Sequence, residues 1–293
     1  MTRVAAAGCA ACALAAAGLG FAGPAPTGDR AKPAATSLAH APSPSATVRT
    51  LERGSRAFPA GVPRVDHERR IGRSSRGAPI HVTAFGTSRA SPKVLVAGCI
   101  HGTECAGIVV TERIVEGCPP THADVWLAPN LNPDGRRLHT RLNGRGVDLN
   151  RNFPAGWRPL GVRWDPQYSG PGPLSEPETR AAQDLIRWLR PAVTIWYHQG
   201  EGPYVRAWGS SIPAARRYAA AARMPFRALP WLAGTAPHWQ NRAFPGSASF
   251  VVELPAGSLT SEAAVRHAAA VELMAGYRGA NRGLVRGSGT EGR

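Results

Sequence analysis

Charged residues and cysteines are both scarce in this chain of 293 residues. Only 18% of the residues are charged, which excludes a wholly disordered polyelectrolyte, and 43% are hydrophobic, enough for a sizeable core. Five cysteines in a chain of this length exclude a small scaffold that depends on disulfides to fold. No internal repeat is visible, so the length suits one large domain or two small ones.

Lysine is almost absent. Of 35 basic residues only Lys32 and Lys93 are lysines, and the 19 acidic residues leave a formal net charge of +16. A basic excess can indicate nucleic acid, anionic lipid or an acidic cell surface as the partner. An excess made of arginine, in a chain rich in alanine, is also what a genome-wide codon bias produces. We therefore expect no nucleic-acid partner.

The chain has one long uncharged run, close to its N-terminus. Arg3 precedes an Ala/Gly/Leu run at residues 4–21, and small residues surround Ala22 and Ala25. This is the pattern of a secretory signal peptide, and Ala and Gly make the run too weakly apolar for a stable membrane anchor. We expect residues 1–25 to be a cleaved signal and the mature protein to be secreted or otherwise extracytoplasmic.

Composition divides the rest of the chain into three parts. Residues 26–63 are rich in Ala, Pro and Ser and show no helical or strand period, which predicts a disordered linker or a pro-segment. Residues 64–282 form the predicted folded domain. Residues 283–293 are rich in glycine and predict a flexible tail.

Strand-like and helix-like segments alternate within the domain. The predicted strands are 79–85, 93–97, 124–131, 193–197 and 249–254, and the predicted helices are 103–116, 175–190, 214–224 and 260–277. Ser175 and Glu178 have the spacing of a capping box at the start of one helix. The alternation predicts an α/β fold, an open sheet with helices on both faces, in which ligands bind beyond the carboxyl ends of the strands.

Polar residues follow two of the predicted strands. His101 and Glu104 come after the strand at 93–97, and His198 comes directly after the strand at 193–197. A His-x-x-Glu pair alone is a weak signal, because such pairs are common on solvated helix faces. His198 at the same sheet edge strengthens it, since two histidines and a carboxylate form a catalytic zinc set with the fourth position left to water.

Glu253 lies near the end of the apolar strand at 249–254, just before Pro255. Acids in such runs are rare unless they are paired or functional. Glu253 is therefore either a salt-bridged strand end or a general base beside a zinc-bound water. The arginine-rich segment 141–153 indicates, on composition alone, no more than a solvated loop.

The motifs taken together resemble those of the zinc carboxypeptidase family, in particular its compact bacterial branch that includes murein peptide amidases. In chain order they are Gly98-x-x-His101-Gly102-x-Glu104, Asn132-Pro-Asp-Gly135, Gly146-Val-Asp148-Leu-Asn150-Arg151-Asn152-Phe153, Tyr168-Ser-Gly-Pro, Ser175-Glu-Pro-Glu-Thr179, His198 and Glu253-Leu-Pro255. The resemblance spans about residues 70–277. It implies a single-domain mixed open sheet and one Zn²⁺ per chain.

The resemblance also implies roles at the metal. His101, Glu104 and His198 correspond to the zinc ligands, and Asp148 to the acid that hydrogen-bonds the first of them and fixes its tautomer. Glu253 corresponds to the catalytic glutamate, which takes a proton as the water attacks.

Further roles concern the substrate. Asn150 and Arg151 correspond to the pair that binds a free C-terminal carboxylate. Arg141 corresponds to the arginine that polarises the scissile carbonyl, with Arg145 as the competing candidate. The larger members carry a mobile tyrosine that is missing between residues 224 and 253, where His238 is either its substitute or a loop histidine with no role.

These roles predict a monomeric metallopeptidase that hydrolyses a C-terminal peptide or amide bond of a peptide or muropeptide, in association with the cell wall. Two alternatives are a zinc deacylase of the aspartoacylase kind and a non-catalytic cell-wall binding module. Of the cysteines in the domain, Cys99 and Cys105 are close enough in sequence to pair, which leaves Cys118 unpaired.

Overall fold

The computed structural model describes residues 67–85, 92–117, 124–200 and 202–277. The predicted signal peptide, linker and tail lie outside these ranges. Within them, no helix is both long and apolar enough to cross a membrane.

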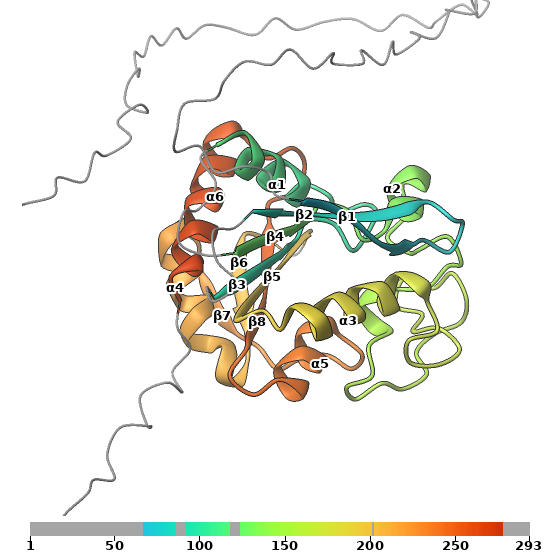
Figure 1. The fold of residues 1–293 in the computed structure, drawn as a ribbon. Coiled ribbons are helices and arrows are strands. Elements are labelled where there is room, and N and C mark those ends of the chain that lie inside the picture. The colour runs from blue at the N-terminus through green and yellow to red at the C-terminus, as the bar shows by residue number, and fades with distance from the viewer. Residues whose placement is uncertain (1–66, 86–91, 118–123, 201, 278–293) are drawn as a thin grey trace, which may run out of the picture. The chain divides into compact units, whose positions relative to one another are not determined.

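The described residues form an eight-stranded sheet in the order β1-β2-β4-β3-β5-β8-β6-β7 (Figure 1). The strands are β1 (His67–Arg73), β2 (Pro79–Phe85), β3 (Lys93–Ala97), β4 (Asp124–Ala128), β5 (Val193–Gln199), β6 (Tyr204–Ala207), β7 (Phe226–Ala228) and β8 (Ala248–Leu254). The four central strands, β4, β3, β5 and β8, run parallel to one another. Antiparallel pairs join β2 to β4 and β6 to β8, so the sheet is mixed and open, as predicted.

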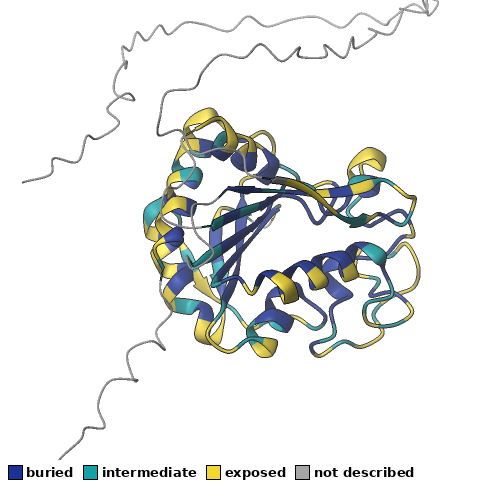
Figure 2. Cartoon of the chain, in the orientation of Figure 1, coloured by how far each residue is buried: buried dark blue, intermediate teal, exposed yellow. Residues whose placement is uncertain are grey.

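Helices cover both faces of this sheet. α1 (Gly107–Glu116), α4 (Ile212–Ala222) and α6 (Ser261–Ala275) pack on one face, and α3 (Pro177–Leu189) and α5 (Ala236–Ala243) pack on the other. Alternation along β8 serves both cores, because Phe250 and Val252 face the first group while Val251 faces the second. Figure 2 shows the central strands buried and the outer sides of the helices exposed.

Helix α1 begins at Gly107, four residues later than predicted. Glu104 N donates to His101 O, and Ile108 N and Val109 N donate to carbonyls three residues back, so tight turns precede the regular helix. His101 and Glu104 therefore both lie in the loop between β3 and α1, although the predicted helix over residues 103–116 would have included Glu104.

The capping box predicted at Ser175 and Glu178 is also wrong. Helix α3 begins at Pro177 after Glu176. The Ser175 hydroxyl donates to Glu176 Oε1 at 2.9 Å, while Glu178 Oε1 accepts from the distant Ser75 N at 2.7 Å. Both side chains are thus held by other partners.

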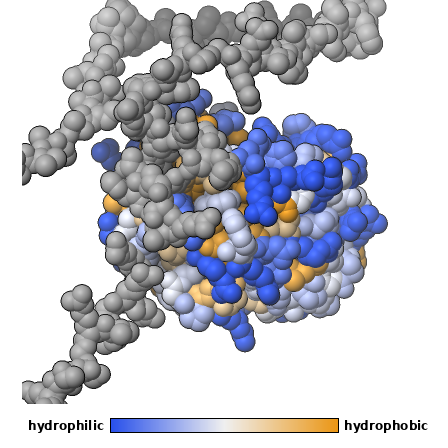
Figure 3. All heavy atoms as spheres, in the orientation of Figure 1, coloured by the Kyte–Doolittle hydropathy of each residue, from blue (hydrophilic) through white to orange (hydrophobic). Residues whose placement is uncertain are grey.

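Arginine side chains pack over exposed tryptophan rings on the surface. Figure 3 shows a face on which hydrophilic side chains predominate, with hydrophobic ones between them. Trp188 and Trp164 are each at least half exposed. The guanidinium carbons of Arg69 and Arg163 lie 5.0 and 5.8 Å from the centroids of these two rings, within the range of cation–π attraction.

Candidate active site

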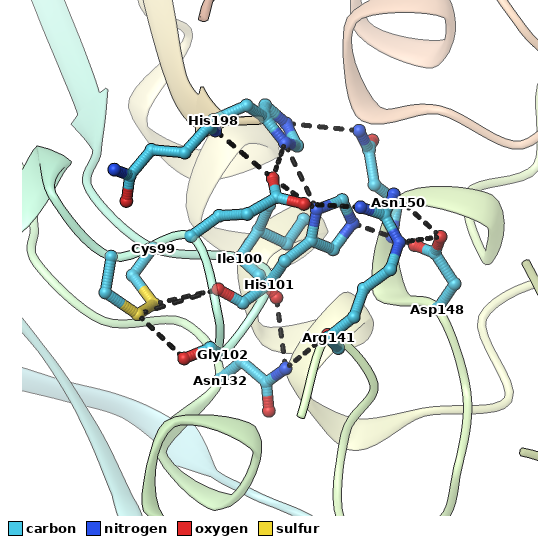
Figure 4. Close-up of polar contacts among 12 residues, drawn as sticks. Cys99, Ile100, His101, Gly102, Asn132, Arg141, Asp148, Asn150 and His198 are labelled. Atoms are coloured by element: carbon cyan, nitrogen blue, oxygen red, sulfur yellow. Dashed lines mark hydrogen bonds and ion pairs between the residues drawn. A yellow bond between two sulfur atoms is a disulfide. The ribbon is translucent and has the colours of Figure 1, made fainter. Parts of the chain in front are cut away.

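Two loop residues and one strand residue converge on a single point. His101 Nδ1 and His198 Nδ1 each lie 2.9 Å from Glu104 Oε2, and the two nitrogens are 3.2 Å apart (Figure 4). His198 is on β5, whereas the other two lie between β3 and α1. Among the described residues they are the one group of three His, Cys, Asp or Glu side chains that could hold a metal ion.

A disulfide links the two residues that flank the segment with His101 and Glu104. A disulfide joins Cys99 to Cys105, with the Cα atoms 4.6 Å apart. Between them, a Cβ added at Gly102 would lie 2.0 Å from the carbonyl carbon of Gly135, so only glycine allows this approach. Cys118 lies outside the described residues.

Asp148 contacts His101 at Nε2, the ring nitrogen that does not face Glu104. Its Oδ1 lies 2.9 Å from His101 Nε2 and accepts from Asn150 N at 2.8 Å, and its Oδ2 accepts from Arg141 Nε at 3.1 Å. Burial raises the pKa of Asp148, but the charges of His101 and Arg141 outweigh it and hold this pKa well below its usual value. The resulting carboxylate favours the tautomer of His101 that leaves Nδ1 for a metal.

The pKa values of the three donors are shifted by burial and by the charged groups around them. Burial raises the pKa of Glu104, yet hydrogen bonds to both histidines outweigh it and place this pKa well below its ordinary value. Burial lowers the pKa of His198, which is therefore neutral at pH 7. Burial lowers the pKa of His101, but the charge and the hydrogen bond of Asp148 outweigh it and raise this pKa above its usual value. Two imidazole nitrogens and a carboxylate oxygen fit catalytic zinc.

A small cavity of about 60 Å³ opens beside this cluster. It is lined by the three candidate ligands and by Arg141, Asn150, Arg151, Gln199, Arg206, Trp231, Leu232, Thr235, Pro237, Val251 and Glu253. The structure thus brings most of the predicted site residues together in one place.

Glu253 reaches the cavity from β8. It pairs with His198 in the parallel register of β5 and β8, and adjacent strands lie about 4.8 Å apart. Its side chain is buried but lines the cavity. A carboxylate here is placed beside the metal ligands and open to a substrate.

Asn150 and Arg151 occupy a short 3-10 turn, Leu149–Arg151, whose first turn is capped by the Asp148 side chain. Asn150 Oδ1 accepts from Ala236 N at 2.9 Å, and Arg151 Nη1 donates to Asn150 O at 2.9 Å. Both side chains are more than nine-tenths buried and line the cavity. The turn therefore presents a fixed guanidinium and amide to a ligand.

The structure distinguishes between Arg141 and Arg145, the two arginines considered for polarising the scissile carbonyl. Arg141 lines the cavity and its Nη1 lies 2.5 Å from Glu104 Oε1. Arg145 does not line the cavity, is half exposed, and lies 3.9 Å from Glu176. Arg141 is the one of the two that is placed to reach a substrate.

His238 is not brought to this cavity. It lies on α5 and lines a neighbouring groove with Trp208 and Trp231, and its Nδ1 is buried with no hydrogen-bond partner among the described residues. The placement gives no support to its predicted contact with the substrate.

Sequence reasoning missed Arg206 and Trp231 as cavity residues. Arg206 lies on the short strand β6 and Trp231 in the connection between β7 and α5, neither of which carried a recognisable motif. In a chain this rich in arginine, composition cannot distinguish one cavity arginine from the rest.

Comparison with known proteins agrees with this geometry. The sequence profile of the family described as zinc carboxypeptidase matches residues 56–236. Murein peptide amidase A of Escherichia coli K12 is 36% identical over 159 residues, which are 50% of this chain and 62% of that protein. The catalytic chain of human carboxypeptidase N is 30% identical over 184 residues, 48% of this chain and 38% of that protein. The chain therefore spans less than two thirds of these relatives.

Solved structures show the same fold. The murein-tripeptide amidase of Escherichia coli O157 superposes with a TM-score of 0.58 at 27% identity, over 75% of this chain and 94% of that one. Carboxypeptidase A of Helicoverpa armigera has a TM-score of 0.61 at 19% identity, over 71% and 68%, a likeness in fold alone. With the profile match covering more than half of its length, the chain belongs to the zinc carboxypeptidase family.

Proposed function

We propose that this protein is an exported zinc-dependent hydrolase that removes the C-terminal residue of a peptide, and that its substrate is a murein peptide with a γ-D-glutamyl link to a diamino acid. One observation carries the hydrolase assignment. The three candidate ligands, Glu253, Arg141 and the Asn150–Arg151 pair line a single cavity.

Each group then has a step in the reaction. A zinc ion held by His101, Glu104 and His198 would acidify a water molecule and polarise the scissile carbonyl. Glu253 takes a proton from the water as its oxygen bonds to the carbonyl carbon. When the C–N bond breaks, Glu253 returns this proton to the leaving amine. Arg141 donates to the carbonyl oxygen as negative charge develops there.

The site also sets which bond is cut. The buried guanidinium of Arg151 can bind a terminal carboxylate, with Asn150 as a second donor. A carboxylate fixed there places the preceding bond beside Glu253, so cleavage removes one terminal residue.

Two observations support the murein substrate and export. The names of the bacterial relatives refer to murein peptides. The first 25 residues have the pattern of a secretory signal, which would deliver the protein to the compartment that contains murein.

Metal analysis and mass spectrometry of products test the proposal. We expect one zinc per chain, cleavage of a murein tripeptide, and little cleavage of peptides whose C-terminus is amidated. Glu253→Gln should keep its zinc and lose about 10²- to 10⁴-fold in turnover. The control Glu272→Gln, at an exposed carboxylate on α6, should behave as wild type. Absence of zinc, or an active Glu253→Gln protein, would refute the hydrolase mechanism, and equal cleavage of amidated peptides would refute the role of Arg151.

A further inference from the structure

A third guanidinium lines the cavity, and neither the motifs nor the mechanism above use it. Arg206 lies on β6, where it pairs with Val251 of the antiparallel neighbour β8, and both residues line the cavity. Glu253 is two residues farther along β8 on the same face, a distance of about 7 Å. The backbone of Arg206 thus lies beside β8 two residues before Glu253, which itself pairs with the metal ligand His198.

Arg206 has few polar partners among the described residues. Nη2 donates to Pro230 O at 2.7 Å, and the guanidinium carbon lies 5.9 Å from the centroid of the Trp231 ring. Among the described residues, the buried Nε has no hydrogen-bond partner and no carboxylate lies within ion-pair distance of the guanidinium group. A buried N–H without an acceptor is unfavourable in the free protein, so an acceptor supplied by a ligand would satisfy it.

The other cavity arginines differ from Arg206 in this respect. Arg141 is paired with both Glu104 and Asp148. Arg151 is the residue to which the proposed function assigns the terminal carboxylate. A substrate that satisfies the whole cavity therefore carries a second anionic group.

We propose that Arg206 determines specificity by binding a second carboxylate, carried by the side chain of the terminal residue. The preferred substrates then end in a dicarboxylic residue, such as glutamate or a diamino dicarboxylic acid. Trp231 and Val251 supply apolar walls for the methylene groups between the two carboxylates. This inference rests on the proposed function, because it takes the terminal residue to be bound by Arg151.

Paired substrates that differ in one carboxylate test the inference. The full zinc-loaded chain is assayed on one peptide ending in Glu or Gln, and on a murein tripeptide ending in diaminopimelate or lysine. We expect kcat/KM to favour the dicarboxylic member of each pair about ten- to hundred-fold, the usual effect of a charged hydrogen bond.

Substitutions at Arg206 should change this ratio. Arg206→Gln should bring it close to one, and Arg206→Glu should favour the lysine-ended tripeptide. The control Arg242→Gln removes an exposed cation of α5 that lies outside the cavity and should keep the wild-type ratio. If Arg206 only donates a hydrogen bond to Pro230 O, the Arg206→Gln variant should have a lower kcat/KM for both substrates of a pair. The ratio of the two kcat/KM values would then stay at its wild-type value, which overturns the proposal. A wild-type enzyme that does not distinguish Glu from Gln overturns it as well.

Binding of free amino acids separates the two hypotheses. Glutamate and glutamine are titrated against the zinc-loaded wild type and Arg206→Gln by calorimetry. If no peptide is hydrolysed, the proposed function fails, but tighter binding of glutamate that is lost in Arg206→Gln still supports the role of Arg206. Equal binding of the two amino acids by wild type refutes that role even if peptides are cleaved.

Discussion

Replacing Asp148 by asparagine should weaken metal binding without removing a ligand. Asp148 is fully buried and accepts from His101 Nε2, from Asn150 N and from Arg141 Nε. Asparagine keeps the shape but offers one acceptor oxygen, so its amide group must face at least one of these donors. The variant also lacks the charge that raises the basicity of His101.

The size of the effect follows from these contacts. Loss of an acid that orients a metal-bound histidine lowers affinity about 10- to 100-fold, which is about 1.4–2.8 kcal/mol. The mismatched amide beside Arg141 should lower the free energy of unfolding by about 1–3 kcal/mol. Competition with a fluorescent zinc chelator measures the first quantity, and chemical denaturation measures the second.

A matched variant provides the control. Asp184→Asn changes an exposed carboxylate on α3 and should leave both quantities at their wild-type values. If Asp148→Asn binds zinc within twofold of wild type, the contact between Asp148 and His101 does not prepare the metal site and the reasoning from Figure 4 is wrong.

Two further predictions concern stability. Gly234→Ala should lower the free energy of unfolding by about 1–3 kcal/mol more than Gly246→Ala, measured by denaturant titration. Both glycines have positive φ, but only at position 234 does a new Cβ meet a neighbour, Arg151 O at 2.1 Å; equal losses would contradict this. Burial, with a smaller contribution from Arg266, lowers the pKa of His267 from 6.5 to about 4, so the native state binds fewer protons than the unfolded chain between these values. Stability is then complete above pH 6.5 and falls by about 3 kcal/mol towards pH 4. In metal-free protein His267→Asn should remove most of this fall, and an unchanged pH profile would refute the assignment.

Two strands have the predicted bounds. Buried apolar residues alternate with more exposed ones along residues 79–85, whereas along residues 93–97 they follow one another. Strand β1 was missed since its sequence is dominated by charged residues, which an exposed edge strand tolerates. β7 has only three residues, too few for a period of two to be recognised.

The residues of the site that belong to motifs could be predicted, but the cavity residue Arg206 could not. His101, Glu104 and His198 follow buried strands, and parallel strands bring their carboxyl ends to one edge. Arg206 reaches the same cavity from an antiparallel strand, and only the register of β6 with β8 reveals this. Pairing between distant segments leaves no local trace in the sequence.

The disulfide between Cys99 and Cys105 has a consequence for the way the ion is lost and regained. The two cysteines are six positions apart, and the ring that they close contains two of the three zinc donors. Closure of this ring does not depend on the metal, so the conformational entropy of ordering that segment is lost once, when the thiols are oxidised, and not again at each binding event. A protein built in this way can release its zinc to a competing chelator and reload later with its loop already assembled.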